Sequence, residues 1–410
     1  MIADQADVAI VGGGPSGLAA ATALREAGVR KVVVLEREAE PGGIPRHAKH
    51  LGFGLRDLHR ALSGPRYAAR LTERALAAGV DLRMQTQATG WTAAGALELT
   101  SPSGRSSLEA KAVILATGCR ERPRAARLIP GTRPHGVMNT GMLQQLVYLA
   151  AERPGRRAVV VGAEHVSFSA LMTLSHGGAR TIAMVTEHPR HQSLAAFRVG
   201  AALRFRVPLL TRTAVTAIHG LRRVEAVEVT HLVTGEVQEL ECDVVVLTGD
   251  WVPDNELAVL AGAALDPGTR GPAVDAELRT SRPGLFAAGN VLHGAETADI
   301  AALSGGHVTP SVLRHLDGAP WPALRVAIVC EPPLHWIAPN AIGQSSREQP
   351  RFRLRARELL GSAQVEVVQN RRTLWRGHVK RLMPGRSAHL PSEWTAFVDV
   401  HGEPVVVRAA

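Results

Sequence analysis

The residues best suited to chemistry form a glycine motif near the start of the chain. Gly12, Gly14 and Gly17 are spaced as G-x-G-x-x-G. The first glycine of this motif allows a sharp turn, the second lets a pyrophosphate approach the backbone, and the third lets a helix lie close to the preceding strand. Glu36 follows, near the spacing of roughly 20 residues at which a carboxylate binds ribose hydroxyls. The pattern predicts a binding site for a dinucleotide.

The flanking sequence predicts the elements that would hold this motif. Residues 8–11 are an apolar run that suits a buried parallel strand. A helix is expected from residue 15 to about residue 27, ended by Gly28, and a second strand ends at Glu36. The helix N-terminus would offer free N–H groups and a positive dipole end to the phosphates. A lone glycine motif is weak evidence, but the strand, the helix and the acid together make the prediction specific.

The opening pattern occurs a second time in residues 157–185. When Gly12 is aligned with Gly162, the strands and helices also coincide, but Glu164 replaces Gly14 and Ser167 replaces Gly17. A glutamate in the loop would block a phosphate and repel its charge. The repeat therefore predicts the same fold with an eroded ligand site. Glu187 could still contact a ribose, so binding of a second nucleotide, NAD(P) or ATP, stays open.

A glycine-rich stretch, residues 40–55, follows the first repeat and suggests backbone packed closely against a ligand. His47 and His50 lie within it, beside basic neighbours. They belong either to an ordinary solvated loop or to a loop near the reactive ring of a cofactor. His50 is the best candidate for an acid or base.

The rest of the chain divides into short strands and a final β-rich part. Residues 96–101 and 106–111 are expected to form a hairpin, and residues 275–280 a further strand. Buried strands ending in small residues are expected at 112–118 (AVILATG), 242–249 (CDVVVLTG) and 285–290 (LFAAGN). One helix is expected over 297–316. After a proline-rich link, residues 325–410 alternate in polarity, which predicts a small β domain with Trp375 and Trp394 in its core.

Composition narrows the functional classes. The 410 residues allow two or three domains, and no apolar run approaches the ~18 residues of a membrane span. The formal net charge is +10, but the arginines are scattered with few aromatics between them, so we do not expect nucleic acid as a partner. An anionic cofactor or an acidic protein explains the charge as well. The first strand begins within the first ten residues, which leaves no room for a signal peptide and predicts the cytoplasm.

The cysteines exclude two kinds of redox centre. Cys119, Cys242 and Cys330 are far apart, and no C-x-x-C occurs. A redox disulfide of adjacent cysteines is therefore excluded, as is an iron–sulfur cluster ligated within this chain alone. All three are expected to be small buried hydrophobes. No Ser-His-Asp grouping and no metal-ligand spacing emerges, so no metal site is predicted.

Six features together resemble the two-dinucleotide-binding-domain flavoproteins, such as the pyridine-nucleotide disulfide reductase superfamily. They are VGGGPSGLAAA, Glu36 at the strand end, AVILATG, the second glycine loop, CDVVVLTG, and LFAAGN followed by a helix. The resemblance covers roughly residues 5–316. It implies an α/β fold of two Rossmann-like domains, the second inserted in the first, followed here by a small C-terminal antiparallel β domain. The implied ranges are 1–122 with 270–320 for the FAD domain, 123–269 for the second nucleotide-binding-type domain, and 325–410 for the β domain.

The resemblance implies FAD across the first domain, with its ADP half on the glycine loop and its ribityl phosphate at Gly289 and Asn290. The usual residue at the latter position is Asp, and Asn is a known alternative. The implied FAD-binding residues are Gly12, Gly14, Pro15, Ser16, Gly17, Glu36, Arg37, Gly43, Ile44, Ala88, Ala116, Thr117, Gly118, Gly289, Asn290 and Ala298. Gly162 and Glu187 are the residues implied for a second nucleotide.

A closer likeness is to the flavin-containing α subunit of heteromeric amine and amino-acid dehydrogenases, a group that includes the opine and hydroxyproline dehydrogenases and hydrogen cyanide synthase. It rests on GGIPRH…GFGL, LSGPRYA, GVMNTGMLQQLVYL and GAEHVSFSA. LFAAGNVLHGAE is also similar to FAD subunits that accompany glycerol-3-phosphate dehydrogenases. In these families a second flavoprotein, the β subunit, oxidises a C–N bond. Some members carry a cysteine-rich iron–sulfur segment, which this chain lacks. Whether a small iron–sulfur subunit is a further partner therefore stays open.

Three functions follow as alternatives. The first is the electron-transferring flavoprotein subunit of a heteromeric amine or amino-acid dehydrogenase, which the eroded second loop favours. The second is a free-standing NAD(P)H-dependent or substrate-oxidising flavoenzyme, which needs a working second nucleotide site or a substrate pocket on the flavin face. The third is a structural or regulatory subunit whose second domain binds some other nucleotide.

Overall fold

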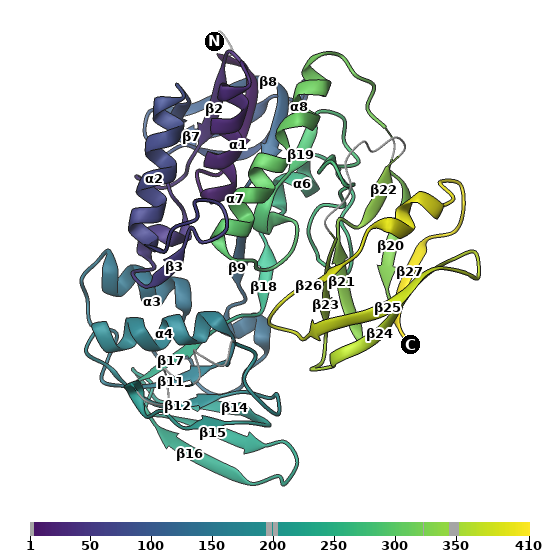
Figure 1. Cartoon of the computed structure of the whole chain (residues 1–410). Helices are drawn as coiled ribbons and strands as arrows, with labels where there is room; N and C mark the ends of the chain where they lie inside the picture. Colours follow the sequence, from purple (N-terminus) through teal and green to yellow (C-terminus); the bar gives the residue numbers. More distant parts are fainter. Residues whose placement is uncertain (1–3, 194–198, 200–203, 323, 344–351) are drawn as a thin grey trace. The chain divides into compact units, whose positions relative to one another are not determined.

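The computed structural model describes residues 4–193, 199, 204–322, 324–343 and 352–410. Their contacts divide the chain into two compact units (Figure 1). The first unit comprises Met1–Arg46, Leu51–Arg120 and Val252–Ala410, and the second comprises His47–His50 and Glu121–Trp251. Residues 252–269, which the sequence assigned to the second domain, belong to the first unit. Among the described residues, no helix is long and apolar enough to cross a membrane.

The first unit is built on a seven-stranded sheet in the order β5-β2-β1-β8-β7-β6, with β19 also beside β8. The central strand β1 pairs in parallel with β2 and β8. Its apolar run from Val8 to Val11 is buried, as expected for a strand covered on both faces. Helix α1 packs against both α2 and α7 (Figure 1). The elements are β1 (Asp4–Val11), α1 (Pro15–Glu26), β2 (Val32–Leu35), β3 (Leu51–Phe53), β4 (Leu62–Ser63), α2 (Gly64–Ala77), β5 (Asp81–Arg83), β6 (Gln87–Trp91), β7 (Leu97–Ser101), β8 (Gly104–Leu115), α6 (Glu256–Leu260), β19 (Leu285–Ala287), α7 (Ala298–His307) and α8 (Thr309–Leu316).

Three predictions for this unit were wrong in detail. The strands expected at 106–111 and 112–118 are one strand, β8, whose first half pairs with β7 and whose second half pairs with β19. The helix expected at 297–316 is two, α7 and α8, because Pro310 in the first turn of α8 cannot donate a helical hydrogen bond. Residues 275–280 form a turn rather than a strand, with Leu278 at φ +60° and a single bridge from Arg279 to Phe286.

The second unit repeats the opening of the chain, as the sequence predicted. Strand β11, helix α4 and strand β12 follow one another as β1, α1 and β2 do, and Gly28 and Gly178 end the two helices with φ of +93° and +77°. A parallel sheet in the order β10-β17-β11-β12-β13 lies beside a three-stranded antiparallel sheet, β14-β15-β16. The elements are β10 (Val137–Asn139), α3 (Thr140–Tyr148), β11 (Arg157–Val161), α4 (His165–His176), β12 (Arg180–Val185), β13 (Leu209–Leu210), β14 (Thr213–His219), β15 (Ala226–His231), β16 (Val237–Glu241) and β17 (Val244–Leu247). The paired strands β9 (Cys119–Glu121) and β18 (Trp251–Pro253) carry the chain between the units.

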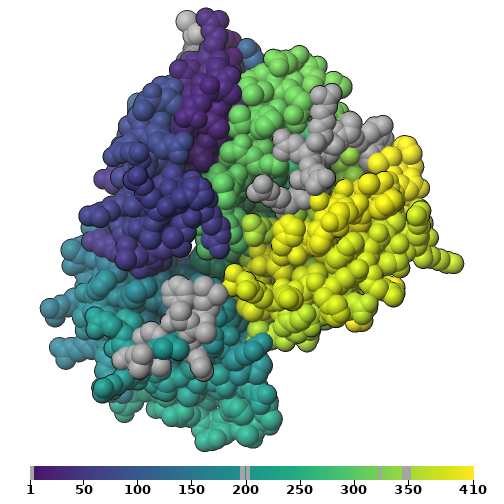
Figure 2. All heavy atoms as spheres, viewed as in Figure 1, coloured from purple at the N-terminus to yellow at the C-terminus, as the bar shows by residue number. Residues whose placement is uncertain are grey.

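The C-terminal residues form two sheets around a hydrophobic core of their own. Pairing is mostly antiparallel, with one parallel pair between β20 and β27. Trp394 is fully buried and Trp375 packs partly against the core. The run TAFVDV at 395–400 alternates in polarity, which favours a strand, but residues 393–397 form a 3-10 helix. The last residues of this region form the yellow part of the surface in Figure 2. The strands are β20 (Leu324–Cys330), β21 (Leu334–Ala338), β22 (Ala341–Gly343), β23 (Phe352–Ala356), β24 (Gly361–Gln369), β25 (Arg372–Leu382), β26 (Ala388–Leu390) and β27 (Val405–Ala409).

Candidate functional site

The first glycine loop has the close contacts that require glycine, and open space where a ligand would lie. A Cβ on Gly12, which has φ +109°, would lie 2.4 Å from the carbonyl oxygen of Ala116. A Cβ on Gly17 would lie 1.9 Å from the carbonyl oxygen of Gly12. A Cβ on Gly14 would meet only the Cα of Gly43, at 4.0 Å. The loop is therefore tight against the sheet and against α1, but free above Gly14.

The N-terminus of α1 carries no side-chain cap from any described residue. Gly14 is the N-cap residue, Pro15 opens the first turn, and that turn contains no acidic residue. Ser16 Oγ is buried and has no hydrogen-bond partner within the part of the chain that the structure describes. An anionic group can bind here, because the site offers uncapped N–H groups, the positive end of the helix dipole and the unpaired Ser16 hydroxyl. The loop thus fits the pyrophosphate of a dinucleotide.

Glu36 is held beside this loop directly after β2. Its Oε2 accepts a hydrogen bond of 2.9 Å from the N–H of Gly13, and its Oε1 accepts one of 2.8 Å from the N–H of Glu38. Burial raises the pKa of this carboxyl, which the two N–H groups oppose. The backbone of Thr86 donates to the carbonyl oxygen of Glu36, so the segment leading to Ala88 also lies here. The structure thus places an acid next to the loop; its contact with a ribose stays a prediction.

Two further predicted segments meet the loop. Gly42 N donates to the carbonyl oxygen of Gly13 at 2.7 Å, and a Cβ on Gly43 would lie 3.0 Å from Gly14 Cα. The next residue, Ile44, is half exposed. Across the loop, Ala116 N donates to the carbonyl oxygen of Val11 at 2.9 Å, which continues β8 toward the glycine turn.

Thr117 and Gly118, just beyond β8, are held by Asp254. The Thr117 hydroxyl donates to the carbonyl oxygen of Asp254 at 2.6 Å, and Asp254 N donates to that of Gly118 at 2.9 Å. Arg37, by contrast, is exposed after Glu36. The segment that the sequence assigned to a nucleotide contact is thus anchored by the backbone of Asp254, a residue that no sequence motif marked.

The segment after β19 touches the same loop from another side. A Cβ on Gly289 would lie 2.7 Å from Ser16 Cβ, and Gly289 N donates to Ser304 Oγ at 3.0 Å. In α7, a Cβ on Gly305 would lie 2.0 Å from the carbonyl oxygen of Ser16. Sequence reasoning missed Gly305, although a glycine pair inside a helical segment is a signal of close packing.

The side chain of Asn290 is fully engaged within its own loop. Its Nδ2 donates to the carbonyl oxygen of Glu296 at 3.1 Å, and its Oδ1 accepts from the N–H of Glu296 at 2.9 Å. These two bonds close residues 290–296 into a loop that leads directly to Ala298, the first residue of α7. The position predicted to meet the ribityl phosphate is therefore set by this closed loop.

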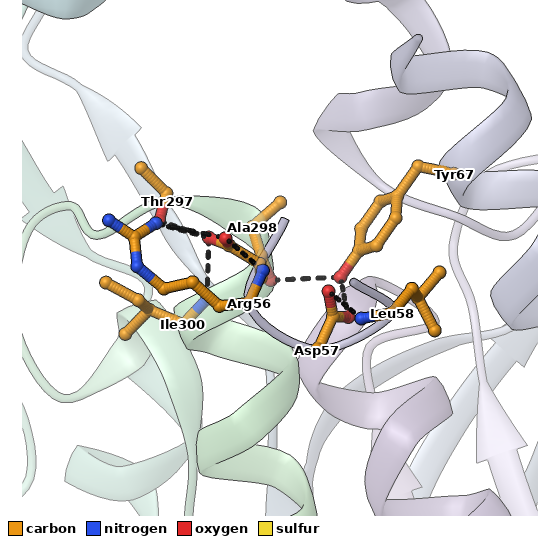
Figure 3. A network of polar contacts seen from close by, with 8 residues as sticks. Arg56, Asp57, Leu58, Tyr67, Thr297, Ala298 and Ile300 are labelled. Carbon is orange, nitrogen blue, oxygen red and sulfur yellow. Dashed lines mark hydrogen bonds and ion pairs between the residues drawn. The ribbon is translucent and has the colours of Figure 1, made fainter. Parts of the chain in front are cut away.

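A polar network joins the β3–β4 region to the start of α7 (Figure 3). Asp299, almost fully buried, accepts hydrogen bonds from the guanidinium of Arg56 at 3.0 Å and from the backbone N–H of Arg56 at 3.2 Å. Tyr67 of α2 donates to Asp57 at 2.5 Å, and burial raises the pKa of its hydroxyl well above the usual range. The network, which no sequence pattern indicated, fixes the loop before α2 to the N-terminus of α7.

The second glycine loop is filled by its own side chains. Glu164, the N-cap of α4, accepts hydrogen bonds from Ala163 N at 3.0 Å and from the Thr248 hydroxyl at 2.6 Å. Its carboxylate and the Ser167 hydroxyl also complete a capping box over the first turn of α4. Gly162 keeps the turn, with φ +133°, and Glu187 is exposed after β12. A carboxylate thus occupies the helix N-terminus that a phosphate would need.

The predicted acid or base, His50, lies in the segment His47–His50, which belongs to the second unit. His47 is buried and its Nδ1 lies 3.3 Å from Gln144 Oε1, and Lys49 lies over the ring of Tyr148. His50 itself is partly buried. Its catalytic role stays a prediction.

Comparison with known proteins assigns the family. Residues 6–305 match the family described as pyridine nucleotide-disulphide oxidoreductase. The chain belongs to this family. It is an FAD-dependent oxidoreductase with two Rossmann-like domains, and the family binds FAD and a pyridine nucleotide. Both the fold class and the cofactor FAD that the sequence implied are confirmed.

The relatives include reductases and subunits of oxidases. A thioredoxin reductase of Treponema pallidum is 29% identical over 70% of this chain and 88% of its own length. An opine oxidase subunit of Rhizobium meliloti is 27% identical over 72% of this chain, which spans 60% of that protein. Among solved structures, the thioredoxin reductase of T. acidophilum superposes with a TM-score of 0.63 at 22% identity, over 77% of this chain and 99% of its own, which shows the shared fold.

The loop around α1 fits FAD on the observations above. The bound flavin would supply the acceptor and donor of electrons. Within this chain, Gly14 and the N-terminus of α1 would hold the pyrophosphate, Glu36 would orient a ribose, and Gly289 with Asn290 would border the ribityl phosphate. These assignments remain proposals.

Proposed function

We propose that the chain is the electron-transferring FAD subunit of a heteromeric dehydrogenase that acts on amines or amino acids. Two groups of relatives support this proposal by name: opine oxidase subunits of Rhizobium meliloti and Agrobacterium tumefaciens, and the alpha subunit of sarcosine oxidase. The chain spans only 60–64% of the first two. The activity, substrate and partners of the complete relatives therefore form part of the proposal.

The observation that carries the proposal is the carboxylate of Glu164 at the N-terminus of α4. A flavoenzyme of this fold that is reduced by NAD(P)H needs a binding site for the nucleotide's phosphates in its second domain. Here Glu164 uses the Ala163 N–H and the Thr248 hydroxyl, and a phosphate would have to displace a like charge. Nicotinamide nucleotides are then poor electron donors for this flavin, and electrons arrive from another protein.

The cysteines argue against a role like that of the thioredoxin reductase relative. Transfer to a disulfide substrate through a dithiol needs two cysteines near each other. Within the described ranges, Cys119, Cys242 and Cys330 form no disulfide with one another. Burial raises the pKa of Cys242 to about 12, so this thiol stays protonated at neutral pH.

A basic groove offers a docking surface for an acidic partner. We call it the arginine groove: an open cavity of about 510 Å³ between α2 and the preceding loop. Arg60, Arg66 and Arg74 on its lining make no ion pair among the described residues, while Arg70 pairs with Glu73 at 3.6 Å. Such surface arginines favour an acidic protein surface and speed its approach. The occupant that we propose is the companion flavoprotein subunit.

Helix α2 lies between the arginine groove and the glycine loop that we assign to FAD. A Cβ on Gly42 would lie 2.6 Å from Cβ of Ala68, so α2 packs on the glycine pair that covers Gly14. A partner bound on the exposed face of α2 would therefore dock one helix away from the loop that we assign to FAD.

The test is reduction of the bound flavin under anaerobic conditions. We expect NADH and NADPH at micromolar concentration to leave the flavin absorbance unchanged over minutes, and amine dehydrogenase activity to appear only with the companion subunit. Rapid bleaching by either nucleotide would overturn the proposal in favour of a free-standing NAD(P)H-dependent enzyme. A nucleotide-binding but redox-inert complex would instead indicate a structural or regulatory subunit.

A further inference from the structure

The C-terminal β domain contacts the first domain at the loop closed by Asn290 and Glu296. Arg355, in β23, donates through Nη2 to the carbonyl oxygen of Ala295 at 3.2 Å, and through Nη1 to that of Gly294. Its Nη2 also lies 3.6 Å from the Glu296 carboxylate. The guanidinium therefore holds three consecutive residues of this loop.

The same loop is held by two further side chains of the C-terminal domain. Ser387 donates a hydrogen bond to Glu296 Oε1. The ring of Trp336 stacks on His293 with centroids 4.7 Å apart, and the guanidinium of Arg355 lies over the Trp336 ring, 4.7 Å from its centroid. Burial lowers the pKa of His293 to about 3, so the imidazole is neutral and does not repel Arg355 at neutral pH.

This contact is buried. Arg355, His293 and Trp336 are 7%, 7% and 4% exposed, and the side chain of Glu296 is 9% exposed. A buried guanidinium is costly unless carbonyl and carboxylate oxygens compensate it, and here two carbonyl oxygens and the Glu296 carboxylate do so. The loop is consequently fixed from outside, by a domain that lies beyond the residues matched to the family.

We propose that the C-terminal β domain is a positioning element of the flavin site, and that Arg355 is its positioning residue. Arg355 holds Gly294 to Glu296. The backbone of Glu296 holds the side chain of Asn290, and Gly289 before it packs on Ser16 of the glycine loop. The β domain thereby sets the backbone that borders the flavin half of the cofactor. This inference rests on the assignment of Asn290 to that half.

The test compares FAD with ADP, because ADP carries only the half that sits on the glycine loop. Arg355→Gln should raise the Kd for FAD roughly tenfold or more, since it removes the charged donor of two carbonyl bonds, and should leave the Kd for ADP within about threefold. Arg357→Gln is the matched control: the residue lies just after the same strand, exposed, and its substitution should change neither value. Arg355→Lys should fall between the wild type and Arg355→Gln.

A double-mutant cycle tests the transmission. Arg355→Gln and Asn290→Ala together should raise the FAD Kd less than the product of their separate effects, because both act through Glu296. If Arg355→Gln does not fold, Ser387→Ala replaces it and should weaken FAD binding severalfold with ADP binding unchanged.

Two outcomes for Arg355→Gln would overturn the inference. One is an unchanged Kd for FAD, and the other is an equal rise in Kd for FAD and ADP, which indicates a general loss of structure. If the wild type itself fails to bind FAD, the cofactor assignment fails, which is distinct from failure of the positioning role.

Discussion

Glu164 Oε1 accepts a hydrogen bond of 2.6 Å from Thr248 Oγ1. The first repeat cannot make this bond. Ala116 is the residue equivalent to Thr248, because the N–H groups of both donate, at 2.9 Å, to the last residue of the neighbouring strand, Val11 and Val161 respectively. In the first repeat the N-cap residue, Gly14, has no side chain, so α1 stays uncapped beside Ala116. In the second repeat Thr248 fixes the Glu164 carboxylate at the N-terminus of α4.

We expect Glu164→Gly to restore part of the lost nucleotide site. Removing the carboxylate frees N–H groups of α4 and removes a negative charge, so the Kd for NADH should fall about tenfold or more, measured by equilibrium titration. Loss of the N-cap side chain should also lower the free energy of unfolding, by roughly a few tenths of a kcal/mol because glycine is itself a tolerated N-cap residue.

Glu164→Gln is the matched variant for this experiment. It removes the charge but keeps a side chain of the same shape in the loop, so its nucleotide affinity should stay near that of the wild type. Equal gains for Gly and Gln would mean that charge alone excludes the nucleotide; no gain for either would contradict our account of the loop.

We expect Gly14→Glu to convert the first loop into a copy of the second. Gly14 has φ −80°, which any residue adopts, and its Cβ position is open, so the chain should fold. The new carboxylate would meet the pyrophosphate, so the purified protein should carry no flavin even after incubation with excess FAD. Gly14→Ala is the control and should still bind FAD, and absorption spectra with far-UV circular dichroism distinguish loss of cofactor from loss of fold.

Charge reversal should weaken docking at the arginine groove. We expect Arg66→Glu, Arg70→Glu and Arg74→Glu combined to slow association with the companion subunit by tenfold or more at low salt, less so at high salt because of screening. A control set with the same charge change, Arg153→Glu, Arg180→Glu and Arg222→Glu on exposed positions of the second unit, should have a much smaller effect. Association rates of the purified subunits measure this, and equal effects of both sets would contradict a specific groove.

Glu121 should make the second unit less stable as the pH rises. It is 4% exposed, its Oε2 accepts from Gly141 N at 3.0 Å, and burial raises its pKa from 4.5 to about 7. Between pH 4.5 and 7 the unfolded chain loses this proton and the folded chain keeps it, so the free energy of unfolding falls with pH, by ~3 kcal/mol at most.

Glu121→Gln should remove this contribution, and urea unfolding at pH 5 to 8 would measure it. The exposed Glu152→Gln in the same unit is the control and should keep the slope of the wild type. An identical pH dependence for Glu121→Gln and the wild type would show that Glu121 is ionised in the folded protein.

The sequence predicted the parts of the site that have local signatures. Glycine spacing, a helix after it and an acid at the strand end are set by neighbours in the chain, so the sequence predicted the glycine turn, helix α1 and the place of Glu36 after β2. Their contacts with a ligand stay predictions. The repeat was found for the same reason, including the replacement of Gly14 by Glu164.

The contacts that the sequence did not predict join residues that are distant from one another in the chain. Asp299 bonds Arg56, and Arg355 bonds Gly294, across sequence separations that no periodicity reveals. The break between α7 and α8 was missed because apolar and small residues continue across it, although Pro310 favours the start of a new helix. The run TAFVDV alternates in polarity like a strand, but its first three residues belong to the 3-10 helix Glu393–Phe397, which also contains the buried Trp394.

The discontinuity of the first sheet has a consequence for how the protein is made. Strand β8 ends at Leu115, but its partner β19 begins only at Leu285, after the whole second unit. At a synthesis rate of roughly 5–20 residues per second, the C-terminal half of β8 stays without this neighbour for about ten to thirty seconds on the ribosome. Gly289, Gly305 and Arg355 emerge later still. The nascent chain can therefore complete its cofactor site only after these residues have emerged, and the edge of β8 is open to wrong pairing until β19 has been made.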